Sequence, residues 1–343
     1  MKRCKGLIWI LMLFASVAMP GHCQTEEPGA TTCQAPFNVG FRVVRIPNGP
    51  LTAIWYPSST AETPHQYHDK FTGMAAVNGA ITACGHFPLV VFSHALGGCG
   101  TQSVFFTEEV ARQGYIVVAP DHADALCSAA GHGAFNGGNS TGSLLAPQKW
   151  TSATYANRRV DLQETTNWIF ASEFASHINP NAIAACGHSL GGYDVLGIAG
   201  GWTNWRDSRF KAVLALSPYS LPFSLQNTLR DIHIPLMYQG AQGDLFITPF
   251  VRGPRGAYGM SNPPKYYMEL KGGTHFAWTD LVCFGSSTVS TCLIAKPNAR
   301  MIDSYGIAFF DEYLKGNPER MRALQGAGVA KFERNLADTA ARP

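Results

Sequence analysis

The stretch Gly187-His188-Ser189-Leu190-Gly191-Gly192 follows an apolar run, residues 181–186, and precedes a plausible helix. It contains the pattern Gly-x-Ser-x-Gly at a predicted strand-to-helix turn, which is the context that makes this pattern a nucleophile elbow. A serine at such an elbow adopts a sparsely populated backbone conformation that lifts its hydroxyl clear of the sheet. Glycines two residues either side leave room for so tight a turn. The stretch predicts that Ser189 is a nucleophile; the alternative is a tight turn that carries a hydroxyl by chance.

Strand patterns alternate with helix patterns over most of the chain. A hairpin pattern at the edge of a sheet comes first, residues 37–57, with Asn48-Gly49 at its turn. The strands predicted after it are 88–93, 115–119, 181–186, 210–216, 234–238 and 266–270, and the helices are 103–113, 154–174 and 302–314. Apolar strands that alternate with helices predict the α/β class, with a mostly parallel central sheet and helices on both faces. No repeat or domain boundary is evident, so we expect a single domain over residues 25–343.

The beginning of the chain has the pattern of a secretory signal peptide. Basic residues within 1–5 precede the uncharged run 6–19, which is shorter than the roughly 20 residues that a membrane span needs. We expect residues 1–24 to form the signal peptide, with cleavage between Gly21 and Thr25. A lipid anchor on Cys23 is an alternative, but the residues before it lack the required pattern. The mature protein is therefore expected to be secreted or periplasmic, without a stable membrane anchor.

The composition bears on possible partners. Charged residues make up only 14% of the chain, and the net charge is +3 without a basic cluster, which argues against a nucleic-acid partner. Glycine and aromatic residues are plentiful, as suits a protein that faces uncharged or apolar material. His65 and His68 lie in a polar segment without other ligands nearby, so we predict no metal site. We expect no cofactor, and a monomer. Residues 139–141 form a glycosylation sequon, which matters only in a eukaryotic source.

The cysteine count indicates disulfides and one free thiol. Of nine cysteines, two fall within the predicted signal peptide, and the remaining odd number leaves at least one unpaired. Export permits disulfides. Cys186, in the buried strand before Ser189, is the expected free thiol. The first expected pair brackets a short loop. The two cysteines of the second pair each follow a predicted strand, and these strands could be adjacent. The third pair consists of the two cysteines that remain. These expected pairs are Cys283–Cys292, Cys99–Cys127 and Cys33–Cys84.

A serine hydroxyl needs a base, and the base needs a group that orients it. In proteins with this elbow the chain order is serine, acid, histidine. Two histidines follow Ser189. His233 precedes its strand and would project from the wrong edge of the sheet. His275 follows the strand 266–270 and would lie at the carboxyl edge beside the elbow. We predict that His275 is the base; the alternative is an ordinary loop histidine.

The orienting acid is expected to follow a strand between Ser189 and His275. Asp244 closes the apolar strand 234–238 through a short glycine-containing turn. The other aspartates in this interval lie on the elbow helix or near the amino ends of strands. The Asp244 carboxylate could accept the imidazole N–H and fix the productive tautomer. We predict this role for Asp244; the alternative is a turn aspartate.

Acyl transfer also needs hydrogen-bond donors for an oxyanion. One expected donor is the backbone N–H of Leu190, which follows the nucleophile directly. The other is expected in the turn His94-Ala95-Leu96-Gly97-Gly98, which comes after the strand 88–93. Leu96 is our candidate there. The alternative is that the glycines serve only a tight strand-to-helix turn.

Three stretches together resemble the α/β-hydrolase superfamily: 92–97, 187–192 and 271–275. They are most similar to the branch that holds platelet-activating-factor acetylhydrolases, dienelactone-hydrolase-like proteins and secreted, cutinase-like polyester hydrolases. The likeness extends over roughly residues 37–314. The motifs are specific for the superfamily and weak for the substrate.

The resemblance implies a serine esterase. The positions that match its triad are Ser189, Asp244 and His275, and those that match its oxyanion donors are Leu96 and Leu190. Two departures stand out. Dienelactone hydrolases have cysteine at the position of the nucleophile, which puts that activity in doubt. Ala95 replaces the glycine usual after His94, which would stiffen the oxyanion loop.

Aromatic residues near the expected cleft are candidates for substrate binding. Tyr219, Phe246 and Phe276 follow the predicted strands at the carboxyl edge. Polyester hydrolases have an aromatic residue at the position that resembles Tyr219. Core packing is the alternative for each of them, and His188 is expected to be a packing or supporting residue. The Gly/Ser/Asn-rich segment 129–149 is either a surface loop or a flap over the site.

We therefore expect an exported carboxylic-ester hydrolase that works through an acyl-enzyme on short-chain, lipid-acetyl or polyester-type esters. A small or polymeric ester would be its partner. Three alternatives stay open. The same residues could transfer acyl groups to alcohols, or cleave amides, although no carboxylate that would bind an amine is evident in the expected cleft. A non-catalytic binding module of the same fold is the third.

Overall fold

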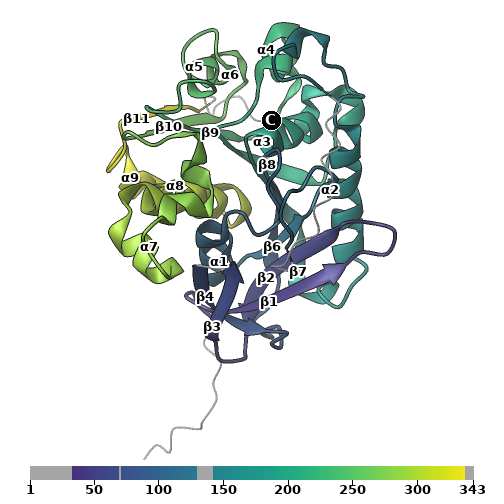
Figure 1. Ribbon diagram of the computed structural model, residues 1–343, viewed down its shortest axis with the longest axis vertical. Coiled ribbons are helices and arrows are strands. Elements are labelled where there is room, and N and C mark those ends of the chain that lie inside the picture. The colour runs from purple at the N-terminus through teal and green to yellow at the C-terminus, as the bar shows by residue number, and fades with distance from the viewer. Residues whose placement is uncertain (1–32, 69–70, 130–141, 337–343) are drawn as a thin grey trace, which may run out of the picture. The chain divides into compact units, whose positions relative to one another are not determined.

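The computed structural model describes residues 33–68, 71–129 and 142–336. The described part contains an 11-stranded sheet in the order β11-β10-β9-β8-β7-β5-β6-β2-β1-β4-β3 (Figure 1). The strands are β1 (Asn38–Arg45), β2 (Leu51–Ser58), β3 (Thr63–His68), β4 (Phe71–Val77), β5 (Phe87–Ser93), β6 (Ile116–Pro120), β7 (Ile178–His188), β8 (Phe210–Leu216), β9 (Leu236–Ala241), β10 (Lys265–Leu270) and β11 (Lys331–Asn335).

Helices connect most of these strands. They are α1 (Val104–Arg112), α2 (Ala156–Ile169), α3 (Leu190–Leu196), α4 (Leu221–Gln226), α5 (Thr248–Val251), α6 (Ala257–Met260), α7 (Val289–Ala295), α8 (Pro297–Leu314) and α9 (Glu319–Leu324). Single 3-10 turns form at η1 (Pro147–Lys149), η2 (Ala175–His177), η4 (Thr203–Trp205), η5 (Leu229–Asp231), η6 (His275–Trp278) and η7 (Asp280–Cys283), and Gly197–Gly201 (η3) is a π-helical turn after α3.

The centre of the sheet is parallel. Strands β6, β5, β7, β8, β9 and β10 pair in parallel, whereas β2 and β11 join on either side as antiparallel strands. Along β5, Val90 and Phe92 pack into one core, and Leu89 and Val91 pack into the other. Successive residues of a strand face opposite sides, so the sheet is buried on both faces. The predicted α/β-hydrolase fold is confirmed.

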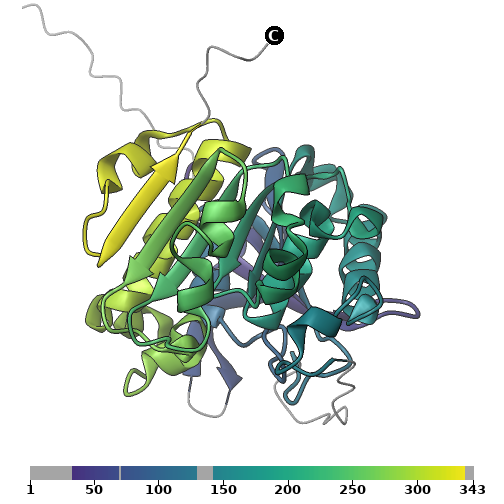
Figure 2. The ribbon, with the colours of Figure 1, turned by 90° about the horizontal axis from the view of Figure 1, so that it is seen from above.

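Each face of the sheet has its own layer of helices (Figures 1 and 2). Buried residues of α1, α7, α8 and α9 belong to one core, and those of α2 to α6 belong to the other. The functional loops leave the carboxyl ends of the parallel strands, which is the edge where open α/β sheets bind ligands. The described residues form one compact unit.

The predicted hairpin forms, but it does not lie at the edge of the sheet. Strands β1 and β2 pair from Asn38 with Ser58 to Arg45 with Leu51, and Asn48 adopts a φ of 58° in the turn. Two strands that we did not predict, β4 and β3, extend the sheet beyond β1. The segment expected to be a polar loop around His65 is therefore a strand. Its short polar sequence lacks the apolar run by which the central strands were recognised.

The cysteine prediction is confirmed. Disulfides join Cys33 to Cys84, Cys99 to Cys127 and Cys283 to Cys292, and Cys186 is a buried free thiol in β7. Cys99 follows the loop after β5, and Cys127 follows the loop after β6. The second disulfide therefore links two loops at the functional edge of the sheet.

Three expectations fall partly or wholly outside the described residues. They concern the signal peptide 1–24, the sequon 139–141 and most of the segment 129–149. Among the described helices, none combines the length and apolar character needed to cross a bilayer.

Candidate active site

Ser189 stands between the end of β7 and the beginning of α3, with φ 56° and ψ −113°. This strained conformation is the one expected of a nucleophile elbow. The neighbouring glycines are required by close backbone contacts. A Cβ at Gly187 would lie 2.2 Å from the Gly191 carbonyl oxygen, and a Cβ at Gly191 would lie 2.0 Å from the Ser93 carbonyl oxygen. Both distances are far below any carbon–oxygen contact, so only glycine fits.

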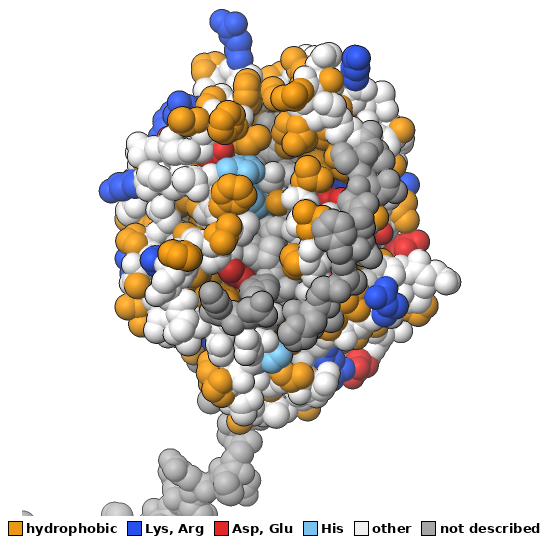
Figure 3. Space-filling view, in the orientation of Figure 1, with side chains coloured by type: hydrophobic (Ala, Val, Ile, Leu, Met, Phe, Trp, Pro, Cys, Tyr) orange, Lys and Arg blue, Asp and Glu red, His pale blue; other side chains and the backbone are white. Residues whose placement is uncertain are grey.

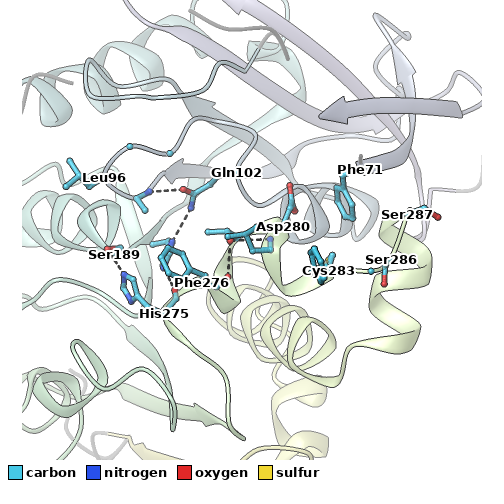
Figure 4. A pocket seen from close by; sticks show the side chains of 18 residues that line it. Phe71, Leu96, Gln102, Ser189, His275, Phe276, Asp280, Cys283, Ser286 and Ser287 are labelled. Atoms are coloured by element: carbon cyan, nitrogen blue, oxygen red, sulfur yellow. Dashed lines mark hydrogen bonds between the residues drawn. The ribbon is translucent and has the colours of Figure 1, made fainter. Parts of the chain in front are cut away.

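The structure brings the predicted base and acid to the serine. His275 Nε2 lies 2.9 Å from Ser189 Oγ, and His275 Nδ1 lies 3.1 Å from Asp244 Oδ2 (Figure 4). Asp244 follows β9 and is buried, whereas the His275 side chain is about one-quarter exposed. Burial alone would raise the pKa of the Asp244 carboxyl, but hydrogen bonds from His275 and Ser217 outweigh burial and hold that pKa below its ordinary value. Asp244 is therefore an anion that can orient the imidazole.

Ser217 is a member of the site that the sequence analysis missed. It follows β8, its φ is 40°, and its N–H donates to the Gln239 carbonyl oxygen at 2.7 Å. Its hydroxyl donates to Asp244 Oδ2 and lies 3.1 Å from His275 Nδ1. The available signal was the position of the serine directly after an apolar strand, at the same edge as the elbow. Ser217 fixes the carboxylate that faces His275.

Three backbone N–H groups around Leu96 in the loop after β5 are engaged. Ala95 N–H donates to Gln102 Oε1 at 3.0 Å, Gly97 N–H donates to Asp124 Oδ2 at 3.2 Å, and Gly98 N–H donates to the Ala95 carbonyl oxygen at 2.9 Å. Among the described residues no acceptor contacts the Leu96 N–H. The Leu96 N–H, our candidate from the sequence, is thus available for an oxyanion.

Leu190 provides the second expected N–H. It is the first residue of α3, and the first N–H groups of a helix have no acceptor within that helix. No other acceptor for it is found in ranges 33–68, 71–129 and 142–336. Because Leu190 follows Ser189 directly, its N–H lies beside the nucleophile, at the positive end of the helix.

A cavity of about 890 Å³ opens above Ser189 and His275. It runs from Leu96 and Ser189 at one end to Phe71 and Ser287 at the other (Figure 4). On the same face of the molecule, hydrophobic side chains surround a hollow that contains a histidine, and lysine and arginine lie toward the periphery (Figure 3). A concave, mostly apolar site with a few polar groups is typical of small-molecule binding.

Only one of the three predicted substrate-binding aromatics lines this cavity. Phe276 does so, with 58% of its surface exposed. Phe246 is 84% exposed and is not among the described lining residues. Tyr219 is buried, its hydroxyl donates to the Leu144 carbonyl oxygen, and its ring packs 4.9 Å from that of Trp150. Although Tyr219 N–H donates to the Ser189 carbonyl oxygen at 2.9 Å, Tyr219 is not among the residues that line the cavity.

The opposite wall of the cavity comes from the segment after His275, which the sequence analysis did not single out. Leu281 and Phe284 line it and are largely exposed, and the disulfide Cys283–Cys292 closes the loop that carries Phe284. Asp280 also lines the cavity, and its Oδ1 accepts from Phe105 N–H at 3.1 Å. The cavity therefore contains a carboxylate, and one of its oxygens is engaged by a backbone N–H.

The comparison with known families agrees with the fold. A family model described as platelet-activating factor acetylhydrolase, isoform II, matches residues 63–139. This segment includes the loop 94–98 and ends before Ser189. No curated protein matches the chain. The resemblance to the platelet-activating-factor acetylhydrolase-like branch of the α/β hydrolases is confirmed, and it indicates a hydrolase of ester bonds.

Proposed function

We propose that this chain, an α/β hydrolase of the branch similar to platelet-activating-factor acetylhydrolases, is an exported serine carboxylic-ester hydrolase. One observation carries the proposal. The two ring nitrogens of His275 face Ser189 Oγ at 2.9 Å and Asp244 Oδ2 at 3.1 Å, at one end of an open cavity. This is the arrangement that turns a weakly nucleophilic hydroxyl into an acyl acceptor.

The proposed reaction has two halves. His275 Nε2 takes the proton of Ser189 Oγ as that oxygen attacks the ester carbonyl carbon. The carbonyl oxygen becomes an oxyanion that accepts from the N–H groups of Leu96 and Leu190, and His275 then returns the proton to the leaving alcohol. Water, deprotonated by His275, attacks the acyl-enzyme in the same way and releases the carboxylic acid and Ser189. Each step needs only protein groups and water.

Asp244 and Ser217 support His275 in both halves. The Asp244 carboxylate accepts a hydrogen bond from Nδ1–H, so that Nε2 carries the lone pair that faces Ser189. When His275 becomes positively charged, the Asp244 anion stabilises it. Ser217 keeps the carboxylate in place through its own hydrogen bond. The three residues act as a unit in this proposal.

The cavity wall favours esters with an apolar acyl or aryl group. Phe71, Phe276, Leu281 and Phe284 line it together with Leu96. Burial of apolar substrate surface against such walls contributes about 25 cal/mol per Å². Asp280 is engaged by the backbone at the start of α1, and we assign it to that role rather than to amine binding. Short-chain, lipid-acetyl and polyester-type esters all satisfy this description.

Export is part of the proposal. The pattern of residues 1–24 and three disulfides fit an oxidising compartment outside the cytosol. We propose that the mature enzyme begins between residues 21 and 25 and works as a monomer without a membrane anchor.

The test is hydrolysis of p-nitrophenyl acetate and butyrate by the mature protein, beside Ser189→Ala and the control Ser224→Ala. The Ser224 hydroxyl is buried and has no partner among the described residues, so its removal matches the lost atom without touching the site. We expect turnover in the wild type and in Ser224→Ala, and a loss of at least about 10³-fold in Ser189→Ala. Equal turnover in all three would exclude Ser189 as the nucleophile. Its absence from a folded wild type would contradict a general esterase.

A further inference from the structure

The side chain of Arg158 is fully buried beneath the candidate oxyanion loop, although it comes from α2, far from that loop in sequence. Its Nε and Nη2 donate to the two carboxylate oxygens of Asp124 at 2.8 and 2.9 Å. Its Nη1 donates to Asp194 Oδ2 at 2.7 Å and to the His94 carbonyl oxygen at 2.9 Å. Nη2 also donates to the Ala95 carbonyl oxygen at 3.2 Å. One guanidinium thus joins α3, the loop after β6 and the oxyanion loop.

The contact with Ala95 concerns the peptide group that carries the candidate oxyanion donor. The Ala95 carbonyl and the Leu96 N–H belong to the same planar, trans peptide, so they point in opposite directions. Three donors contact this carbonyl: His94 Nδ1 at 2.7 Å and Gly98 N–H at 2.9 Å from within the loop, and Arg158 Nη2 at 3.2 Å, which comes from outside it. The Leu96 N–H is therefore directed away from Arg158. Leu96 lines the cavity with Ser189, and the N–H is free of other acceptors within the described part of the chain.

Asp124 fixes the loop on the other side of Leu96, and we call Arg158 and Asp124 together the clamp. Its Oδ2 accepts from Gly97 N–H at 3.2 Å as well as from Arg158. Burial would raise the pKa of Asp124, but Arg158 outweighs it and holds that pKa well below its ordinary range. The carboxylate is therefore ionised and accepts on both sides. The peptide groups before and after Leu96 are both fixed by the same buried ion pair.

We propose that Arg158 is a positioning residue for ester hydrolysis, which fixes the Leu96 N–H in the direction of the oxyanion through the Ala95 carbonyl. The inference rests on the proposed function. The pair of buried aspartates alone requires a positive charge at this place. A positive charge alone would not explain the further contacts of the guanidinium. Its planar set of N–H donors also contacts two successive carbonyls of the loop while it binds both aspartates.

Lysine is the discriminating substitution. It preserves the positive charge between Asp124 and Asp194, but a single ammonium group lacks the planar fork of Arg158. It cannot serve both carboxylates and the carbonyls of His94 and Ala95 with the same geometry. Arg158→Lys should therefore release the oxyanion loop more than it destabilises the fold. Arg159→Lys is the matched control on the same helix, where the side chain bonds only Gln163 among the described residues.

The experiment measures oxyanion binding apart from substrate binding in folded wild type, Arg158→Lys and Arg159→Lys. We expect Arg158→Lys to lower kcat/KM for p-nitrophenyl butyrate by about 10- to 100-fold, less than or near the loss of a whole oxyanion donor. Inhibition by phenylboronic acid, whose serine adduct is tetrahedral, should weaken by a similar factor. Inhibition by p-nitrophenyl butyl ether, which lacks the carbonyl, should stay within about twofold, since it makes no oxyanion contact.

A spectroscopic readout separates positioning from a general loss of packing. The infrared carbonyl stretch of an acyl-enzyme formed with a slowly hydrolysed ¹³C=O ester should move to higher wavenumber in Arg158→Lys, because weaker hydrogen bonds polarise the carbonyl less. If the wild type is active and Arg158→Lys has the same carbonyl stretch and the same boronate inhibition as the wild type, the proposal is overturned. A wild type without turnover would instead contradict the proposed function.

A second variant covers the case in which Arg158→Lys does not fold. Asp124→Asn keeps one acceptor oxygen but loses the other, so either Gly97 or the guanidinium loses a partner. It should shift boronate inhibition and the carbonyl stretch in the same direction. A folded Asp124→Asn protein with wild-type values for both would count against the clamp.

Discussion

His188 Nε2 lies 2.9 Å from the carbonyl oxygen of His275. Burial lowers the pKa of His188 well below its ordinary value, and the nearby His275 lowers it further. A neutral ring that donates from Nε2 must accept at Nδ1, where Gln102 Nε2 lies 3.3 Å away. Gln102 in turn accepts from Ala95 N–H. The residue between the elbow glycine and Ser189 thus connects the loop of the base with the loop of the oxyanion donor.

This connection predicts that His188→Ala lowers activity without removing a reacting group. The variant removes one hydrogen-bond partner from the His275 carbonyl and one from the Gln102 amide, which costs about 1–3 kcal/mol of stability. We expect kcat/KM for p-nitrophenyl butyrate to fall by about tenfold, measured at temperatures where the variant is folded. His86→Ala, at an exposed position, is the control. A His188→Ala protein with wild-type kcat/KM would show that the connection does not serve catalysis.

Ser217→Ala tests the support of the acid. Loss of the hydroxyl removes one of the hydrogen bonds that lower the Asp244 pKa, so that pKa should rise. We expect kcat/KM to fall by about 3- to 10-fold, far less than the roughly 10⁴-fold expected for Asp244→Asn, which disturbs the tautomer of His275. The pH dependence of kcat/KM checks both variants. The idea fails if Ser217→Ala matches Asp244→Asn in severity or has no effect.

The cavity predicts different roles for Phe276 and Phe246, two of the candidate substrate-binding aromatics. Phe276 lines the cavity and Phe246 does not. Phe276→Ala should therefore raise KM for p-nitrophenyl butyrate by about 3- to 10-fold through lost apolar contact, whereas Phe246→Ala should leave KM within about twofold. Steady-state kinetics of the two variants decide this. Equal effects on KM would mean that the cavity is not the substrate site.

Asp161 predicts a specific pH dependence of stability. It lies 2.8 Å from His122 Nδ1, and burial raises its pKa to about 7, while burial also lowers the pKa of His122. His122 Nε2 contacts Ser93 Oγ, whose proton goes to Asp194, so His122 donates there and accepts from a protonated Asp161. Because the folded pKa of Asp161 is raised, its contribution to stability is present below about pH 4 and is lost as pH rises through about 7.

Asp161→Asn removes this titration and keeps a donor for His122. The free energy of unfolding in urea should therefore fall less steeply between pH 4 and pH 7 in the variant than in the wild type, by at most about 4 kcal/mol over the window. Glu319→Gln, an exposed carboxylate on α9, should follow the wild type. Parallel pH profiles for wild type and Asp161→Asn would contradict a protonated Asp161.

The disulfide Cys99–Cys127 joins the loops that carry the oxyanion peptide and Asp124, with a sequence separation of 28 residues. Replacement of both cysteines by serine should lower the free energy of unfolding by about 3–4 kcal/mol. The same change at Cys283–Cys292, which closes 9 residues, should cost about 1 kcal/mol less. Denaturant unfolding measures both. The reverse order would show that native-state contacts, rather than loop closure, determine the effect.

The central sheet and the elbow could be predicted because their signals are local. Near-continuous apolar runs mark β5 to β10, and the glycines around Ser189 are fixed by backbone contacts within the turn. Asp244 and His275 follow from strand ends and chain order. Strands β3 and β4 could not be predicted, because β3 is short and polar and β4, although largely apolar, is short and lacks a strict alternation.

The supporting residues of the site could not be predicted either, because their roles depend on contacts between distant segments. In the sequence, Arg158 is one of two adjacent arginines on a predicted helix, and nothing distinguishes it from its neighbour. Only the fold places it between Asp124 and Asp194. The far wall of the cavity lies in a loop where exposed Leu281 and Phe284 have no spacing that identifies them. For Tyr219 the sequence indicated the position beside Ser189, where its backbone lies, but not the packing of its ring against Trp150.

Cys186 allows transient opening of the central sheet to be measured through its reactivity. It is the free thiol among the described cysteines, it lies in β7 three residues before Ser189, and burial raises its pKa well above the ordinary value. A thiolate-directed reagent can therefore modify it only after the central sheet separates. The rate of modification in the absence of denaturant would report how often β7, the strand before the nucleophile, opens enough to expose this thiol. No engineered probe is needed for this measurement.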